Sequence, residues 1–214
     1  MRILITLVNA AMFGISFYYR GWYVFFFFTV WALCLSIIYM PVSVLATKGS
    51  PSMNLLAWHH ILFSATFFSN IVVTTIYWPL LHSMYIAREE IATNPIRLAC
   101  AYGMHAVPIL GSIYNFKTID AVLKASHAKA LIPVMVAYLY VNYRATLAAG
   151  QTLYWFLSWE DWTTGAVAIF LLAVFLGAYI LCARATIFFR PRKSATFKLI
   201  DGILYRIRSR RGSK

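Results

Sequence analysis

One histidine lies well inside an apolar segment, where an imidazole is costly unless it is paired or functional. His105 stands in the stretch YGMHAVP, residues 102–108. Gly103 allows another helix to approach closely, and Pro108 has no N–H for the carbonyl of Met104, which leaves backbone polarity beside the imidazole. Two interpretations remain open from position alone: a histidine bonded across helices for packing, or a catalytic group.

A catalytic imidazole would act here as a general base, because its ordinary pKa lies near pH 7. Such a base needs a nucleophile. The candidates on predicted membrane helices are Thr29, Ser36, Ser43, Ser64, Thr66, Ser69, Thr74, Thr75 and Cys100. Helical Ser and Thr usually bond to the carbonyl four residues earlier, so each has a structural explanation. Thr29 differs mildly, as the only Ser or Thr in the first half of an apolar and aromatic helix.

The remaining histidines, acids and cysteines do not form a metal-binding pattern. His59 and His60 are adjacent, so on a helix they point about 100° apart and cannot chelate one ion together. His82 lies near the end of the same run and His127 in a polar loop, and no HxxxH or HExxH motif occurs. The acids all lie outside the long apolar runs: Glu89, Glu90, Asp120, Glu160, Asp161 and Asp201. The cysteines are few and far apart, which predicts small buried apolar groups at Cys34, Cys100 and Cys182. We expect no metal and no cofactor.

The elements that must position these residues are membrane helices. Hydrophobic residues make up 62% of the 214 residues and charged residues 12%, whereas about a quarter of a soluble domain is charged. A membrane helix needs about 20 mostly apolar residues, and the runs of this kind are Ile3–Tyr19, Trp22–Ala46, Asn54–Ile86, Ile96–Phe116, Ala130–Tyr143 and Thr163–Phe189. The sequence therefore predicts an all-α integral membrane protein, a bundle of six transmembrane helices.

Several segment boundaries carry specific expectations. We interpret residues 1–19 as a retained first helix rather than a signal peptide, because another span follows at once. The third run is too long for a simple span, so it is tilted or extends beyond the bilayer. The fifth run can extend past Arg144. Three tryptophans in Gln151–Trp162 favour an interfacial loop or short helix.

Charge predicts the orientation and the domain organisation. With six spans, one side holds Arg2, Lys48, Lys117, Lys124, Lys129 and nine cations from Arg190 onward, and the other side holds Arg20, Arg88, Arg97 and Arg144. Cytoplasmic loops carry the excess of Lys and Arg, so both termini are expected in the cytosol. We divide the chain into a transmembrane domain, residues 1–189, and a basic cytosolic tail, residues 190–214. The tail's helical apolar spacing suits the surface of an anionic membrane, although a partner-binding or targeting tail is the alternative. We therefore expect the net charge of +13 to serve binding to anionic lipid headgroups rather than to nucleic acid.

One region resembles a known family. It contains Tyr77-Trp78, then the run YIAREE at residues 85–90, Asn94-Pro95, and Tyr102-Gly103-Met104-His105 with Pro108 following. This stretch of about 40 residues resembles the androgen-induced-gene/FAR-17a family of six-span membrane proteins. The Trp-bearing segment near 155–162 and the final span after it also fit the family's layout.

The resemblance implies a lipid hydrolase. Members of the family are threonine hydrolases that cleave fatty acid esters of hydroxy fatty acids, with a Thr on an early helix as nucleophile and the His of the Gly-Met-His segment as second catalytic residue. That His corresponds to His105, and the Thr corresponds to Thr29. The family's Thr follows its Trp by about one helical turn, whereas Thr29 follows Trp22 by two, and both spacings lie on one helix face. The expected substrate is a membrane lipid.

Two other functions stay open at this point. The small size and basic tail also suit a non-enzymatic accessory or assembly subunit of a membrane complex. A transporter fits less well, because no acidic residue lies within a span and the halves show no repeat. The expected location is the endoplasmic reticulum or plasma membrane rather than mitochondria, and protein partners, the exact lipid and the oligomeric state are not predicted.

Overall fold

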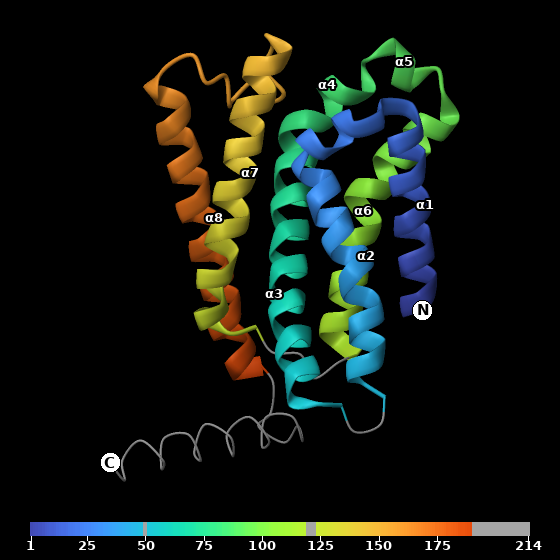
Figure 1. The fold of residues 1–214 in the computed structure, drawn as a ribbon, viewed down its shortest axis with the longest axis vertical. Coiled ribbons are helices and arrows are strands. Elements are labelled where there is room, and N and C mark those ends of the chain that lie inside the picture. The colour runs from blue at the N-terminus through green and yellow to red at the C-terminus, as the bar shows by residue number, and fades with distance from the viewer. Residues whose placement is uncertain (49–50, 119–122, 190–214) are drawn as a thin grey trace.

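A computed structural model of the chain describes residues 1–48, 51–118 and 123–189, with side chains up to residue 185. This part of the chain is helical and contains no strand (Figure 1). Six of its helical segments are long and apolar enough to cross a membrane: Arg2–Phe26, Phe28–Ala46, Met53–Ile86, Pro95–Thr118, Ala125–Ala149 and Trp162–Ala185. The predicted all-α protein with six spans is confirmed, and the chain is an integral multi-pass membrane protein. The predicted tail, residues 190–214, lies outside the described residues.

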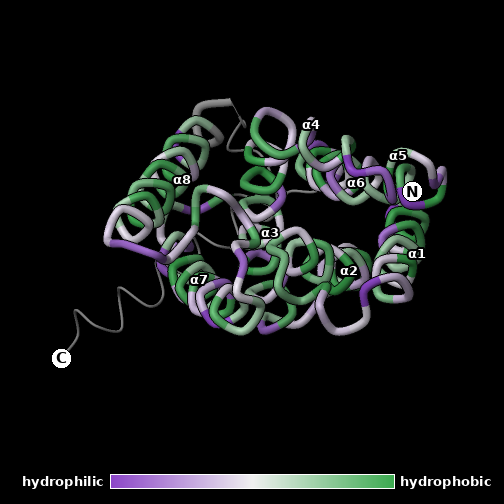
Figure 2. The backbone as a smooth tube through the Cα atoms, turned by 90° about the horizontal axis from the view of Figure 1, so that it is seen from above, coloured by the Kyte–Doolittle hydropathy of each residue, from purple (hydrophilic) through white to green (hydrophobic). Residues whose placement is uncertain are grey.

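The helices are α1 Arg2–Arg20, α2 Phe28–Ala46, α3 Met53–Ile76, α4 His82–Ile86, α5 Glu89–Ala92, α6 Pro95–Thr118, α7 Ala128–Ala149 and α8 Trp162–Phe189. Helix α3 lies at the centre of the molecule, with α1, α2 and α6 on one side and α7 and α8 on the other, as Figures 1 and 2 both show. The N-terminus and the α2–α3 connection lie at one end of the bundle, and α4, α5 and the α7–α8 connection lie at the other.

The connection between α1 and α2 corrects one predicted boundary. The second helix was expected from Trp22, but Gly21–Phe26 form a 3₁₀ segment and Phe27 is extended, so α2 begins at Phe28. Gly21 ends α1 with a positive φ of 55°, a conformation that glycine adopts without steric cost. Trp22 and Thr29 therefore do not share a helix face, and Thr29 stands in the first turn of α2. Hydropathy could not reveal this break because the 3₁₀ segment is itself apolar.

The long third span is continuous but not uniform. A π-helical turn, Tyr77–Leu81, joins α3 to α4. Pro79 lies within this turn and has no N–H for a helical hydrogen bond, which explains the local change of pitch. The turn places Tyr77, with 3% of its surface exposed, on the inner side of the bundle.

Asn94 marks the start of α6, and Gly150 marks the end of α7. Asn94 caps α6 by accepting hydrogen bonds from the N–H groups of Ile96 and Arg97, both at 3.1 Å. Helix α7 continues past Arg144, as the sequence allowed, to Gly150, whose φ of 61° ends it. Between α7 and α8, residues 150–161 form a loop without a helix, so of the predicted loop or short helix the structure shows a loop.

Large apolar side chains cover the outside of the bundle. On α8, Ile169 is 70% exposed and Leu181 is 66% exposed, and Figure 2 shows α8 largely in the hydrophobic colour. Inside, rings from α3 meet rings from α8, with Phe68 packing edge-on against Phe175 and Tyr179. Apolar surface on both sides of a helix is expected when lipid replaces water around the protein.

Candidate functional site

The structure brings the two predicted catalytic residues together. The Thr29 hydroxyl lies 3.2 Å from Nε2 of His105, within hydrogen-bonding distance although the residues are 76 positions apart. Thr29 comes from the first turn of α2 and is partly exposed, while His105 comes from the middle of α6 and is 8% exposed. The pair thus lies between the second and fourth spans.

The second ring nitrogen determines how this pair is polarised. Nδ1 of His105 lies 2.6 Å from the backbone carbonyl of Ala101. A carbonyl oxygen can only accept, so in the neutral ring the proton is assigned to Nδ1. Nε2 is then an acceptor and the Thr29 hydroxyl donates to it. This is the arrangement that a general base needs towards a nucleophile.

Aromatic and hydroxyl groups of the third span hold the imidazole in place. The Tyr77 ring stacks on the His105 ring with an interplanar angle of 8° and centroids 3.3 Å apart. The Thr74 hydroxyl donates to the backbone carbonyl of His105 at 3.4 Å. The Tyr77 hydroxyl in turn contacts Nδ1 of His82 at 3.2 Å. The π-helical turn therefore supplies the surface against which the candidate base is oriented.

Most other candidate nucleophiles are bonded to backbone carbonyls. The donors are Ser36 to Ala32, Ser43 to Met40, Ser64 to His60, Thr66 to Leu35, Thr74 to His105 and Cys100 to Met12. The carbonyl four residues before Thr29 belongs to Phe25, and it accepts from the Trp31 indole at 2.8 Å. Thr29 thus makes its hydrogen bond to an imidazole and not to its own helix.

Two cavities meet at Thr29. A polar cavity of about 600 Å³ lies between α1, α2, α4 and α6 and includes His105 in its wall. A narrow apolar pocket lies between α2, α3, α7 and α8, and Met135, Leu139 and Phe175 are among its lining residues. Four residues line both spaces: Thr29, Tyr77, Leu81 and Tyr154. The Thr29 hydroxyl therefore lies at the boundary between a polar and an apolar chamber.

Tyr154 belongs to the site, although the sequence did not indicate it. It lies in the loop between α7 and α8, and its hydroxyl accepts a hydrogen bond from the backbone N–H of Phe28 at 3.3 Å. Burial raises the pKa of the Tyr154 phenol above its ordinary value, so the group stays protonated at neutral pH. Only the tryptophans of this segment had suggested a role, and a loop gives no periodicity from which the position of a phenol could be deduced.

Asn70 and Gly103, two further residues near the candidate pair in the sequence or fold, have structural roles. The Asn70 amide nitrogen lies within hydrogen-bonding distance of the Ser36 hydroxyl, the Pro108 carbonyl and the Ser112 hydroxyl, and the residue is 2% exposed. Gly103 faces Met12 of α1 so closely that a β-carbon would collide with the methionine sulfur. Gly103 thus allows the close helix approach that was predicted.

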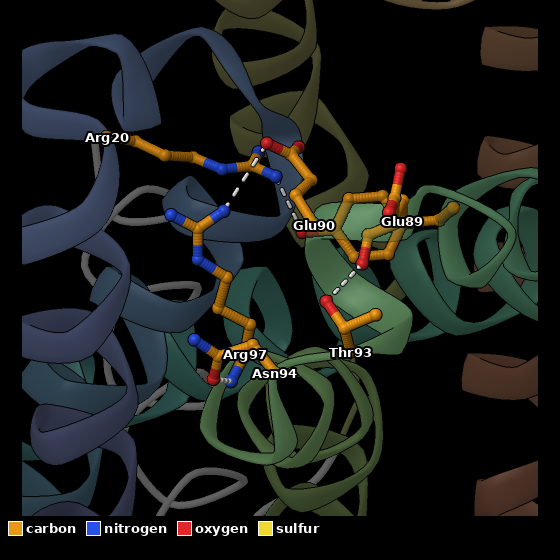
Figure 3. Close-up of polar contacts among 7 residues, drawn as sticks. Arg20, Glu89, Glu90, Thr93, Asn94 and Arg97 are labelled. Carbon is orange, nitrogen blue, oxygen red and sulfur yellow. Dashed lines mark hydrogen bonds and ion pairs between the residues drawn. The ribbon is translucent and has the colours of Figure 1, made fainter.

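Cationic side chains surround the mouth of the polar cavity. Arg20, Arg88, Arg97 and Glu90 all contribute to its lining. Figure 3 shows Arg20 and Arg97 converging near Glu90, with Arg97 Nη1 and Glu90 Oε2 3.3 Å apart. The Arg20 guanidinium donates to the Tyr85 hydroxyl at 2.6 Å. The candidate pair therefore opens towards a space with a positive rim.

The remaining histidines lie elsewhere. His59 and His60 are buried on α3, while His127 contacts the Ser64 hydroxyl at 2.9 Å. Within the described residues, no three or more His, Cys, Asp or Glu side chains are grouped so that they could hold a metal ion. Of the cysteines, Cys100 is buried as predicted, but Cys182 is exposed on the apolar face of α8, where a small apolar side chain suits lipid as well as a protein core.

Comparisons with known proteins add no assignment, since no protein-family model, curated protein or solved structure matches this chain.

Proposed function

We propose that this protein is a membrane-embedded lipid ester hydrolase that cleaves fatty acid esters of hydroxy fatty acids, with Thr29 as nucleophile and His105 as base. The observation that carries the proposal is the 3.2 Å contact from the Thr29 hydroxyl to His105 Nε2, on a ring whose Nδ1 is bonded to the Ala101 carbonyl. The resemblance to the androgen-induced-gene/FAR-17a family supports the same pair and substrate class.

The chemistry is acyl transfer in two steps. The Thr29 oxygen attacks the ester carbonyl while His105 takes the hydroxyl proton, and the resulting tetrahedral intermediate breaks the bond to the alcohol oxygen. The imidazolium gives its proton to the leaving alcohol. A water molecule, deprotonated by the same imidazole, then attacks the acyl-threonine and releases the fatty acid with the Thr29 hydroxyl restored.

The negative charge of the tetrahedral intermediate needs hydrogen-bond donors. Thr29 stands in the first turn of α2, where the N–H of Phe28 donates to the Tyr154 hydroxyl and the N–H of Val30 donates to the Phe27 carbonyl. Tyr154 reaches the same turn, where its oxygen accepts from Phe28 and its hydroxyl also interacts with that of Tyr138, and a protonated phenol can donate to a nearby oxyanion. We infer that the Tyr154 phenol stabilises the oxyanion. Such donors are among the largest contributions to catalysis of acyl transfer.

The substrate's two parts match the two chambers at Thr29. The apolar pocket is lined by aliphatic and aromatic side chains from α3, α7 and α8, which suits a hydrocarbon chain. The polar cavity on the α1 and α6 side offers space for the other half of the ester. A lipid ester with its carbonyl at the boundary would place the reacting carbon beside Thr29.

We also infer the orientation of the site in the membrane. The cavity opens at the end of the bundle that holds α4, α5 and the α7–α8 loop, away from the N-terminus. If the cation-rich side of the protein faces the cytosol, as the charge pattern predicts, then the cavity opens on the opposite face.

The test is hydrolysis of a hydroxy-fatty-acid ester by membranes that contain the wild type or a variant. Thr29→Ala and His105→Ala are expected to lose activity, and Thr29→Ser is expected to retain part of it because it keeps a hydroxyl. Equal expression of each variant is checked by immunoblot. Retained activity in both alanine variants would exclude this mechanism.

A further inference from the structure

The cations at the cavity mouth are unusual for the end of the bundle on which they lie. This end carries four cations in the charge pattern, Arg20, Arg88, Arg97 and Arg144, and the first three line the polar cavity. Glu90 is the one acidic residue of that lining, so the lining has a formal surplus of two positive charges. Orientation of the helices does not require cations at this end, which points to a role in the cavity.

Arg20 is held with much of its hydrogen-bonding capacity unused. One terminal nitrogen donates to the Tyr85 hydroxyl at 2.6 Å, and the guanidinium lies 5.1 Å from the centroid of the Phe27 ring and 5.4 Å from that of Tyr85. A guanidinium has five N–H donors, and Arg20 forms this one hydrogen bond among the described residues. The aromatic rings fix the position of this guanidinium, which contributes to the lining of the polar cavity.

Arg97 is similarly placed on the other side of the cavity. Its guanidinium lies over the Tyr19 ring at 4.3 Å, and its Nε is buried without a partner among the described residues. Its salt-bridge partner Glu90 is 58% exposed, so that ion pair is strongly screened by water. Figure 3 shows Arg20 and Arg97 approaching one another from α1 and α6. Two guanidinium groups that converge are stabilised by an anion that both can bind.

The distance from this rim to the catalytic pair suits a lipid. Arg97 and His105 lie eight residues apart on α6, which corresponds to about 12 Å along the helix axis. An alkyl chain can bridge this distance between an anionic group at the rim and an ester carbonyl at Thr29.

We propose that Arg20 and Arg97 form a carboxylate-binding subsite that holds the free acid of the alcohol half of the substrate, while the neutral acyl chain occupies the apolar pocket. This inference rests on the proposed function, and it specifies which half of the substrate lies in which cavity. The apolar pocket contains no charged side chain in its lining, so a carboxylate there would lose its hydration without compensation. The acyl-threonine therefore carries the uncharged chain, and the carboxylate leaves with the alcohol through the polar cavity.

Kinetics with paired substrates test the subsite on the full-length protein in phosphatidylcholine nanodiscs. One substrate is a palmitoyl ester of a hydroxystearic acid, and the other is the same ester with its free acid methylated. Arg20→Gln is expected to lower kcat/KM for the acid by about tenfold to a hundredfold, the range of a lost charge-assisted hydrogen bond, and to change the methyl ester by less than about threefold. Glu90→Gln removes the competing carboxylate and is expected to raise kcat/KM for the acid. Arg144→Gln is the matched control, since Arg144 is on the same end outside the cavity and bonds Tyr140.

A binding measurement separates this inference from the proposed function. In Thr29→Ala, cis-parinaric acid is expected to bind more tightly than its methyl ester, and Arg20→Gln is expected to remove the difference. If Thr29→Ala still hydrolyses esters but the acid preference depends on Arg20, the proposed function fails and the subsite stands. If Arg20→Gln slows both substrates equally, or if acid and methyl ester bind alike, the subsite is contradicted while hydrolysis by Thr29 is unaffected.

A last arm distinguishes a substrate carboxylate from a phospholipid headgroup. Nanodiscs that contain phosphatidylglycerol are compared with phosphatidylcholine alone. Acid-selective kinetics that persist in both support the carboxylate subsite. Loss of the acid preference when phosphatidylglycerol is present would assign the arginines to lipid headgroups at the membrane surface and overturn the proposal.

Discussion

Two hydroxyl–imidazole pairs lie at opposite ends of the bundle, and they differ in the direction of their hydrogen bonds. At one end the Thr29 hydroxyl contacts His105 at 3.2 Å, and at the other the Ser64 hydroxyl contacts Nδ1 of His127 at 2.9 Å. By distance alone the second pair is the better one. The positions of the protons instead favour the Thr29–His105 pair as the catalytic one.

Ser64 already has an acceptor for its proton. Its hydroxyl donates to the His60 carbonyl at 3.0 Å, so towards His127 it acts as acceptor and the imidazole donates. Thr29 is polarised in the opposite sense, because the Ala101 carbonyl places the proton of His105 on Nδ1 and leaves Nε2 to accept. A hydroxyl that accepts from an imidazole is not activated for attack.

The two pairs also differ in whether a cavity reaches the hydroxyl. Ser64 is 0% exposed, and neither of the two cavities that meet at Thr29 includes Ser64 or His127 in its lining. Thr29 lies on the wall of both. A short contact between a hydroxyl and an imidazole therefore indicates catalysis only when the ring's other nitrogen carries the proton and a cavity reaches the hydroxyl.

The largest expected effect comes from exchanging the imidazoles. His105→Gln is expected to lower the hydrolytic rate by about a hundredfold to ten-thousandfold, the usual range for a general base. His127→Gln is expected to leave the rate per folded molecule within about threefold, because its partner is not the nucleophile. Initial rates on equal amounts of purified, folded protein provide the measurement. Similar losses in both variants would show that the two pairs are not functionally distinct.

The next effect concerns Tyr154, which has no counterpart at the Ser64 end. Tyr154→Phe keeps the ring and removes the donor, so kcat is expected to fall by about a hundredfold or more, as for other oxyanion donors. Tyr140→Phe, which also removes one phenol hydroxyl but lies outside both cavities, serves as control. A Tyr154→Phe enzyme with unchanged kcat would remove this residue from the mechanism.

Substitutions in the Ser64 pair are expected to lower stability more than substitutions in the Thr29 pair, although they affect activity less. Ser64→Ala leaves the half-buried His127 nitrogen without its partner, so the free energy of unfolding is expected to fall by about 1 kcal/mol while activity is retained. Thr29→Ala removes a partly exposed hydroxyl beside a cavity that water can fill, and it is expected to cost less. Thermal unfolding in detergent compares the two variants. A larger loss of stability for Thr29→Ala would argue that Thr29 is the structural residue.

The smallest effect lies at the start of α8, beside the loop that carries Tyr154. A hydrogen bond from the Thr163 hydroxyl lowers the pKa of Asp161 below its ordinary 3.8, and the carboxylate also accepts from the Thr163 N–H at 2.9 Å. A lowered carboxyl pKa contributes stability that is complete above the ordinary value and is lost as the pH falls through the folded value. The thermal midpoint of the wild type is expected to drop slightly below pH 4, and Asp161→Asn should flatten that part of the profile.

The spans could be predicted from the sequence because each is a long apolar run, but the start of α2 could not. The phenylalanines of the 3₁₀ segment Gly21–Phe26 are as apolar as the helix that follows, so hydropathy shows no boundary there. His105 could be singled out as a polar residue within a span. Thr29 could be assigned as the nucleophile only with the family resemblance. Its predicted placement on one helix face with Trp22 was wrong, although its hydroxyl lies 3.2 Å from His105 Nε2.

Other parts of the site depend on tertiary structure alone. Tyr154 reaches α2 through an irregular loop, and the meeting of Arg20 with Arg97 depends on how α1 packs against α6. Asn70 is a further case, since nothing in the sequence shows that its buried amide nitrogen is held by three partners. Sequence patterns locate polar residues along a helix, but not the loops and neighbours that determine which of them remain available.

Labelling with a fluorophosphonate probe, followed by mass spectrometry of the modified peptide, tests directly whether Thr29 is a nucleophile activated by His105. The probe is expected to modify Thr29, Thr29→Ala and His105→Gln are expected to abolish the modification, and Ser64→Ala is expected to retain it. Modification of Ser64, or labelling of Thr29 that does not depend on His105, would show that Thr29 is not activated in this way.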